Sequence, residues 1–270
     1  MKTIATIARS AADSPNMEAN DAAILECIAS ELRAMGATVI SHGQGQLPPG
    51  ICIVCHMSRT PATLQMLSEA EQGGTTVINS PCAVRNCSRA EMMKALESAA
   101  VPQPEFRFIG TPGELDSLHY PAWLKRADGW SSSKDDVCFA ADSSAARSIF
   151  GQMQARGIKE CVYSRHIEGD IIKFYSVGRQ YFHYCYPDPE KSKFGLERIN
   201  GTQHHYPFSP ESLRAIAHKA AEATGVEIYG GDCIVDSKGD IYLIDLNDFP
   251  SFTAVRHEAA REIAEYIMKR

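Results

Sequence analysis

Two aspartates and an asparagine near the end of the chain have the spacing of a β-hairpin. Asp232 lies in one apolar run, and Asp245 and Asn247 lie in the next, beyond a turn at residues 236–239. Because side chains alternate along a strand, Asp245 and Asn247 share a face, and a closed hairpin brings Asp232 within reach of them. Carboxylate and amide oxygens suit Mg²⁺ that is held partly by substrate phosphates. The spacing therefore predicts a metal site.

An alternative interpretation is that Asp and Asn simply end this strand, with Asn247 and Asp248 starting a turn before Pro250. For Asp232 taken alone, that interpretation is favoured. All three together, embedded in strongly apolar strands, favour the metal site.

Positively charged candidates stand upstream of the hairpin. Lys125 lies in an apolar run where an unpaired lysine is costly, so we expect a phosphate partner unless it faces solvent on an edge strand. Arg89 begins a helix that runs to about residue 100, where its guanidinium and the first amides could bind phosphate. The polar loop at 127–134 contains further hydroxyl donors at Ser131, Ser132 and Ser133.

The substrate side of the site is expected around residues 171–206. A hairpin at 171–186 is followed by a long polar segment at 187–206 that is rich in basic and titratable groups. Lys173, Arg198 and Asn200 are the preferred contacts to a small anionic substrate, either a carboxylate or a phosphate. The alternative is a solvated loop of mixed charge, because acidic residues lie among the basic ones.

The order of the expected elements positions these residues. The first 80 residues alternate strand and helix, which predicts a small open sheet flanked by helices. Strands and helices alternate less regularly at 81–160, and antiparallel hairpins dominate 161–270. We therefore expect three lobes with boundaries near residues 80 and 160.

Bulk composition narrows the function classes. The 270 residues carry a net charge of −6, which argues against binding nucleic acid through general electrostatics. No apolar run reaches the length of a membrane span, and the N-terminus is typical of a first strand rather than a signal peptide. Nine cysteines, an odd number, indicate free thiols in a reducing compartment, so we expect a cytoplasmic location.

The hairpin segment, GGDCIVDSKGDIYLIDLNDFPSF, resembles the C-terminal metal-binding hairpin of ATP-grasp enzymes. The similarity continues upstream in the expected order, over most of the chain. It implies an ATP-grasp fold, α/β overall and α+β in the C-terminal half, preceded by a small Rossmann-like lobe. It also implies ATP with Mg²⁺, or Mn²⁺ in its place, and superfamily members are often homodimers.

The resemblance also assigns roles to particular residues. Lys125 and Arg198 are expected to act on the transferring phosphoryl group, and Asp232, Asp245 and Asn247 are expected to bind the metal. The nucleotide contacts that it implies are Arg89, Lys125, Ser131, Ser132, Ser133, Tyr163, Ser164, His166, Ile167 and Glu168.

One departure from the family pattern leaves the reaction open. Many amide-forming members carry an arginine just before the first metal-binding acid, and Gly230-Gly231 occupies that place here. The expected activity is ligation of a carboxylate to an amine or thiol through an acyl phosphate. The alternatives are a kinase acting on a polyol or inositol phosphate, and a nucleotide-binding regulatory protein without turnover.

Overall fold

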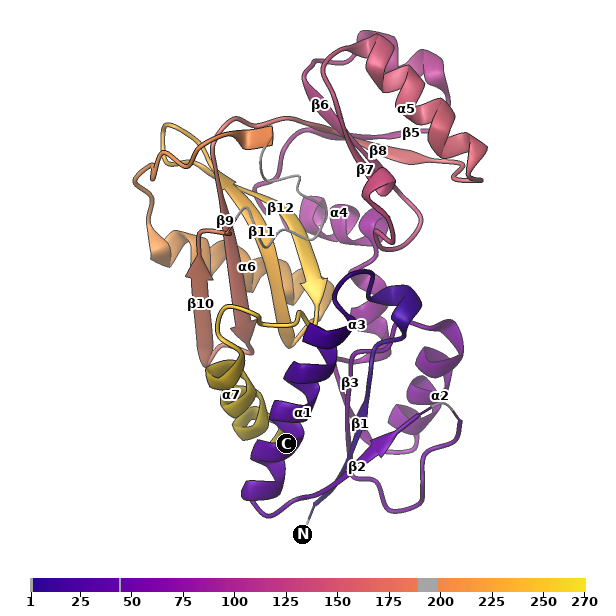
Figure 1. Cartoon of the computed structure of the whole chain (residues 1–270), viewed down its shortest axis with the longest axis vertical. Helices are drawn as coiled ribbons and strands as arrows, with labels where there is room; N and C mark the ends of the chain where they lie inside the picture. Colours follow the sequence, from indigo (N-terminus) through magenta and orange to yellow (C-terminus); the bar gives the residue numbers. More distant parts are fainter. Residues whose placement is uncertain (1, 44, 189–198) are drawn as a thin grey trace.

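Three four-stranded sheets and the helices that cover them form the computed structural model, which describes residues 2–43, 45–188 and 199–270 (Figure 1). Each sheet forms one lobe of the molecule. The mixed α/β architecture confirms the predicted fold class. No described helix is both long enough and apolar enough to cross a bilayer.

The N-terminal sheet is fully parallel, with the strand order β2-β1-β3-β4. Helix α1 connects β1 to β2, and helix α2 connects β3 to β4, in agreement with the predicted alternation of strand and helix. Pro61 at the first position of α2 suits a helix start, because its missing N–H has no partner there anyway. The elements are β1 (Thr3–Ile7), α1 (Glu18–Ala34), β2 (Thr38–His42), β3 (Ile53–His56), α2 (Pro61–Gln72) and β4 (Thr76–Ile78).

The central sheet is antiparallel, with the order β5-β8-β6-β7. Helix α5 packs on it through Ala146, Phe150 and Met153, which lie on one side of the helix. The Asp142 side chain accepts a hydrogen bond from the Ala145 N–H and caps this helix. The elements are β5 (Phe106–Ile109), β6 (Ala122–Arg126), β7 (Val137–Ala140), α5 (Ser143–Ala155) and β8 (Cys161–Arg165).

The C-terminal sheet is also antiparallel, with the order β10-β9-β11-β12. Both predicted hairpins are present, and α6 ends at Gly225, whose φ of 80° is left-handed and favours glycine. The elements are β9 (Asp170–Val177), β10 (Tyr181–Cys185), α6 (Pro210–Thr224), β11 (Ile228–Val235), β12 (Ile241–Asp248) and α7 (Arg256–Met268).

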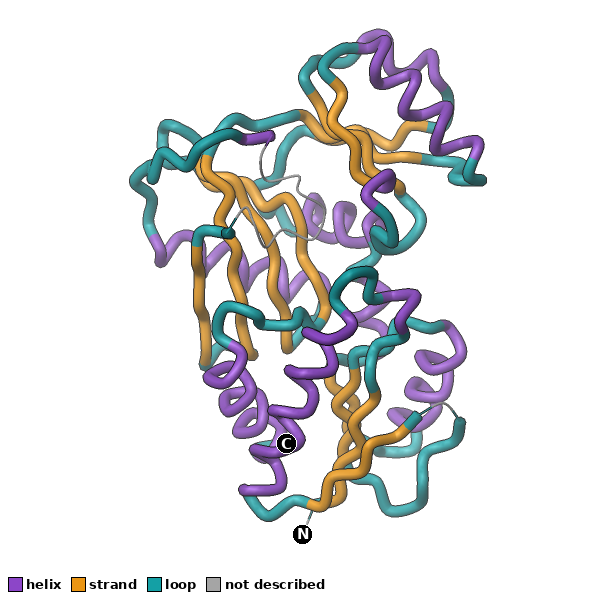
Figure 2. Tube along the Cα trace, viewed as in Figure 1, coloured by secondary structure: helices purple, strands orange, loops and turns teal. Residues whose placement is uncertain are grey.

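Figure 2 shows the strands in separate groups with helices against them. Some helices pack in a lobe other than the one they adjoin in the sequence. Helices α3 (Pro81–Asn86) and α4 (Arg89–Ser98) share a core with α6 and the C-terminal sheet. Helix α7 packs instead against α1 of the first lobe (Figure 1). The lobe boundaries near residues 80 and 160 stay predictions. All nine cysteines are free, as expected, and Cys52 and Cys82 are exposed.

Strand β11 approaches its neighbours very closely at Gly230 and Gly231. A Cβ atom on Gly231 would lie 2.2 Å from the Asp245 carbonyl oxygen and 2.6 Å from the Phe174 ring. On Gly230 it would lie 2.7 Å from the Phe174 carbonyl oxygen. Backbone atoms cannot move away as a flexible side chain can, so packing excludes any side chain at both positions.

We predict that Gly231→Ala lowers the free energy of unfolding by about 3 kcal/mol, because the new methyl group overpacks a buried strand. Urea denaturation monitored by circular dichroism measures this. Gly151→Ala in α5 is the matched control. Its Cβ would have no neighbour within 4 Å, so a gain of about 0.5–1 kcal/mol is expected from helix propensity. A Gly231→Ala protein as stable as wild type would contradict the packing argument.

Candidate functional site

A cavity of about 370 Å³ lies where the three lobes meet. The C-terminal hairpin contributes Asp232 and Asp245, β6 contributes Lys125, and the loops after β1 and β3 contribute Arg9 and Arg59. Its wall therefore depends on elements that are far apart in sequence.

The two aspartates face each other across paired strands. Asp232 on β11 is the register partner of Asp245 on β12, and the register shifts immediately after Asp232. Asn247 lines the same cavity and donates from Nδ2 to Asp245 Oδ2 at 2.9 Å. The hairpin thus brings the three residues together as their spacing predicted, and their role as metal ligands stays a prediction.

Cations from other elements surround these carboxylates. Lys173 on β9 places Nζ 2.9 Å from Asp232 Oδ1, and Arg89 at the start of α4 places Nη1 3.2 Å from Asp245 Oδ1. Burial alone would raise the pKa of Asp245, but Arg89 and Lys125 hold it below its usual value. Asp245 therefore remains a carboxylate at neutral pH.

Lys125 is a buried cation of the site, with 7% of its surface exposed. Its Nζ donates to the Ile244 carbonyl oxygen at 3.4 Å, a long contact for a hydrogen bond. Burial, and then the neighbouring Arg89, lower the pKa of Lys125 to about 7, against the opposite effect of Asp245 and Asp232. A ligand that brings negative charge to this position would favour the protonated lysine.

Of the three serines in the polar loop at 127–134, only Ser131 lines the cavity. Ser131 accepts a hydrogen bond from Arg89 Nη2 at 3.2 Å. The backbone N–H groups of Ser132 and Ser133 donate instead to Asp136 Oδ2, at 2.8 and 3.0 Å. Asp136 is fully buried, and its carboxylate requires these donors. Ser132 and Ser133 therefore lie outside the cavity.

Only some of the predicted nucleotide contacts at residues 163–168 line the cavity. Ser164 and Ile167 line the cavity. The Tyr163 ring packs in the core of the central lobe, and its hydroxyl donates to the His119 carbonyl oxygen. The backbone of β8 also pairs with β5 on one side and β6 on the other, so its groups are already used.

His166 and Glu168, on either side of Ile167, lie outside the cavity. The Trp123 Nε1 donates to His166 Nδ1 at 3.0 Å. Glu168 is exposed to solvent. Neither residue lines the cavity, and their contacts with a nucleotide stay predictions.

The three predicted substrate contacts have different outcomes. Lys173 lines the cavity beside Asp232. Asn200 also lines it, but its Nδ2 donates to the carbonyl oxygens of Ile167 and Gly169, at 3.2 and 3.3 Å, and so stabilises the chain after β8. Arg198 lies outside the described residues.

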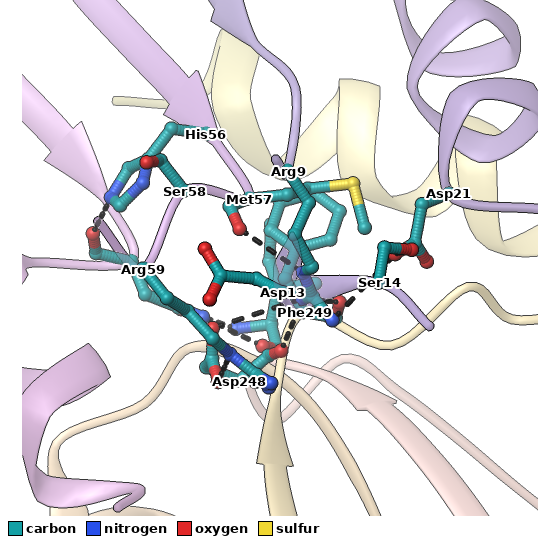
Figure 3. A network of polar contacts seen from close by, with 12 residues as sticks. Arg9, Asp13, Ser14, Asp21, His56, Met57, Ser58, Arg59, Asp248 and Phe249 are labelled. Atoms are coloured by element: carbon teal, nitrogen blue, oxygen red, sulfur yellow. Dashed lines mark hydrogen bonds and ion pairs between the residues drawn. The ribbon is translucent and has the colours of Figure 1, made fainter. Parts of the chain in front are cut away.

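Sequence reasoning missed two arginines of the first lobe. Figure 3 shows Arg9 and Arg59 converging on Asp248 at the end of β12. Arg59 places Nε 2.9 Å and Nη2 2.6 Å from the same oxygen, Asp248 Oδ1. The alternation of strand and helix was a partial signal, because residues that follow the strands of a parallel sheet meet at one edge of it. The structure shows that β1 and β3 are parallel neighbours.

Arg9 is held mainly by backbone oxygens. Its Nε donates to the Met57 carbonyl oxygen at 3.1 Å, and its Nη2 donates to the carbonyl oxygens of Asp248 and Phe249 at 3.0 and 2.8 Å. Asp21, which is buried, lies 3.7 Å from Nη1 and accepts hydrogen bonds from two serine hydroxyls. Arg9 therefore joins the first lobe to the end of β12.

Comparison with solved structures identifies the architecture. A RimK domain ATP-grasp protein from Sphaerobacter thermophilus matches with a TM-score of 0.69 and 17% identity, over 98% of this chain and 99% of its own. D-alanine–D-alanine ligase from Bacillus anthracis complexed with ATP matches with a TM-score of 0.75 and 12% identity, over 100% and 97%. This chain has the ATP-grasp fold.

A third solved structure is also similar to this chain. The ATP-grasp ligase PsnB, complexed with a phosphomimetic variant of its minimal precursor, Mg and ADP, matches with a TM-score of 0.68 and 14% identity, over 100% and 98%. No model of a known protein family matches the sequence, and no curated protein matches it. At these identities, the likeness establishes the ATP-grasp fold and leaves the chemistry to the residues of the site.

The depressed pKa of Lys125 leads to a prediction about stability. The folded-state pKa of about 7 lies below the usual 10.5, so protonated Lys125 opposes folding below pH 7, and this cost disappears as the pH rises toward 10.5. Lys125→Met should therefore raise the free energy of unfolding at pH 6 by a few kcal/mol, on the order of the shift itself. The difference in the free energy of unfolding between the variant and the wild type should shrink between pH 7 and 9.5. Urea denaturation of both proteins across this range measures it, and a constant difference would contradict the assigned shift.

Proposed function

We propose that the protein is an ATP-dependent ligase that joins a carboxylate to an amine or thiol through an acyl phosphate. The observation that carries the proposal is the pair of opposed carboxylates, Asp232 and Asp245, set among Arg89, Lys125 and Lys173 in one cavity. Phosphoryl transfer depends mainly on positioning and on charge stabilisation, and this arrangement supplies both.

The cavity lining contains groups that suit both parts of a nucleotide. Apolar and aromatic side chains that can enclose a base are present, namely Trp123, Val137, Ile167, Ile171, Ile234 and Ile244. Lys125 and Arg89 also line the cavity and would neutralise phosphate oxygens. The Ser131 hydroxyl, already bonded to Arg89, would contribute a further donor.

The oxygen donors of the C-terminal hairpin fit a magnesium ion shared with phosphates. Asp232, Asp245 and Asn247 offer hard oxygens on paired strands, whereas no three His, Cys, Asp or Glu side chains form a metal-binding group within the described ranges. An ion held here would therefore need further oxygens from the ligand, as Mg²⁺ in nucleotide sites does. When bound, it would neutralise charge on the terminal phosphates.

In the proposed reaction, a carboxylate oxygen of the substrate attacks the γ-phosphorus of ATP, and ADP leaves. The acyl phosphate is then opened by an amine or thiol, which loses a proton as orthophosphate departs. Lys173 stands beside Asp232 on β9 and would orient the anionic substrate. The ATP-grasp neighbours named as ligases support this class of reaction, and the identity of the substrate rests on direct assay.

We predict that Asp245→Asn and Asp232→Asn each lower Mg²⁺-dependent ATP turnover by at least about 100-fold, because each removes a charge that holds the metal and its phosphates. Asp240→Asn is the matched control, since Asp240 is exposed at the turn of the same hairpin and should leave turnover unchanged. ADP release with pooled carboxylates and hydroxylamine, which converts an acyl phosphate to a hydroxamate, measures the reaction.

The same assay separates the competing functions. Hydroxamate supports the ligase, whereas ADP released with polyol phosphates and without hydroxamate would indicate a kinase. A melting temperature that rises with Mg²⁺-ATP but not with ATP and EDTA would establish nucleotide binding. Binding without ADP release from either substrate class would leave the regulatory function. Turnover within threefold of wild type in both variants would refute the metal assignment.

A further inference from the structure

Close packing excludes an arginine from the position just before Asp232, where many amide-forming ATP-grasp enzymes carry one. The strand that carries Asp232 has Gly230 and Gly231 before it, and any Cβ there would meet backbone atoms at 2.7 or 2.2 Å. No arginine can stand at either position while β9, β11 and β12 keep their register. A cation that acts on the phosphoryl group must therefore come from another element.

The described cationic side chains that line the cavity are Arg9, Arg59, Arg89, Lys125, Arg165 and Lys173. Lys173 pairs with Asp232, while Arg89 and Lys125 surround Asp245. Arg165 is exposed, and Arg9 is occupied by three backbone carbonyl oxygens. Besides Arg89 and Lys125, Arg59 is a further buried cation with binding capacity.

Asp248 fixes the Arg59 guanidinium, but not all of its nitrogen atoms are bonded. Both of its bonds, from Nε and Nη2, go to Asp248 Oδ1, so Nη1 has no partner among the described residues. Burial alone would lower the pKa of Arg59, but Asp248 raises it, so the side chain stays charged. With 7% of its surface exposed, Arg59 presents a fixed positive charge at the cavity wall.

Trp130 connects this arginine to the loop that follows β6. The Arg59 guanidinium carbon lies 4.9 Å from the centre of the Trp130 ring, a cation–π contact. The neighbouring Gly129 and Ser131 are bonded to Arg89, through the Arg89 N–H at 3.1 Å and Nη2 at 3.2 Å. One short loop therefore contacts both arginines.

Two further donors on this wall are buried and unpaired. Trp130 Nε1 and Arg89 Nε make no hydrogen bond with any described group. Both residues line the cavity with Arg59, and the three come from different elements. Buried donors without partners are costly, and an oxyanion in the cavity would satisfy them.

We propose that Arg59 contacts the terminal phosphoryl group of bound ATP, with Trp130 as a second donor, and so replaces the arginine that the Gly230-Gly231 strand cannot carry. This inference rests on the proposed function. It assigns the transfer step to a residue of the first lobe, so that the phosphoryl group lies between cations of all three lobes.

The test compares the affinities of the protein for two nucleotides by isothermal titration calorimetry, using Mg²⁺-ADP and the Mg²⁺ complex of the β,γ-imido analogue of ATP. Arg59→Met should lower the affinity for the triphosphate analogue about tenfold and keep that for Mg²⁺-ADP within twofold. Arg147→Met is the control and should change neither, because Arg147 pairs with Asp116 on the surface of α5.

Two milder variants allow for a fold that needs the ion pair with Asp248. Arg59→Lys keeps the charge but loses the free Nη1, and Trp130→Phe keeps the ring but loses the N–H. Each should lower the affinity for the triphosphate analogue about threefold without changing that for Mg²⁺-ADP.

Equal losses for both nucleotides, or no loss, would assign Arg59 a merely structural role and overturn the inference alone. A wild-type protein that binds neither nucleotide would overturn the proposed function and this inference together.

Discussion

Two carboxylates of like charge face each other across adjacent strands, and the arrangement of the site depends on relieving their repulsion. Asp232 and Asp245 are register partners, a position where like charges destabilise a sheet. Lys173 and Arg89 each contact one of them, and Lys125 lowers the pKa of Asp245 from a third element. The cations come from different lobes, so the charge balance of the hairpin holds the lobes around one cavity. A metal ion with nucleotide phosphates would satisfy the same charges in another way.

A second buried charge cluster connects the first lobe to the same strand. Asp248 ends β12 with 1% of its surface exposed and pairs with Arg59, while Arg9 binds the adjacent carbonyl oxygens. Buried ion pairs contribute little net stability, but loss of one partner is strongly destabilising. The cluster therefore fixes the contact between the first lobe and β12, and it places two arginines that follow strands of the N-terminal sheet at the cavity wall.

The elements of the fold were largely predictable from local pattern. The alternation of strand and helix in the first 80 residues predicted the first lobe, and the two hairpins of the C-terminal lobe were also predicted. The spacing of Asp232, Asp245 and Asn247 predicted their convergence, because a hairpin is a local structure whose register follows from its turn. Side-chain direction in loops was less predictable. Ser132 and Ser133 bind the buried Asp136 instead of facing the cavity.

The sequence by itself determined the residue types, the strand alternation and the hairpin that bring the oxygen ligands together, because these depend on short-range geometry. The tertiary structure alone added Arg9 and Arg59 to the cavity wall, beside the cations that the sequence had indicated. Arg59 stands 186 residues before Asp245 in the chain, and no local pattern relates the two. Their proximity follows from the packing of the first lobe on β12. The close approach that excludes a side chain at Gly231 is likewise a property of three packed strands, because it depends on the distance between backbones.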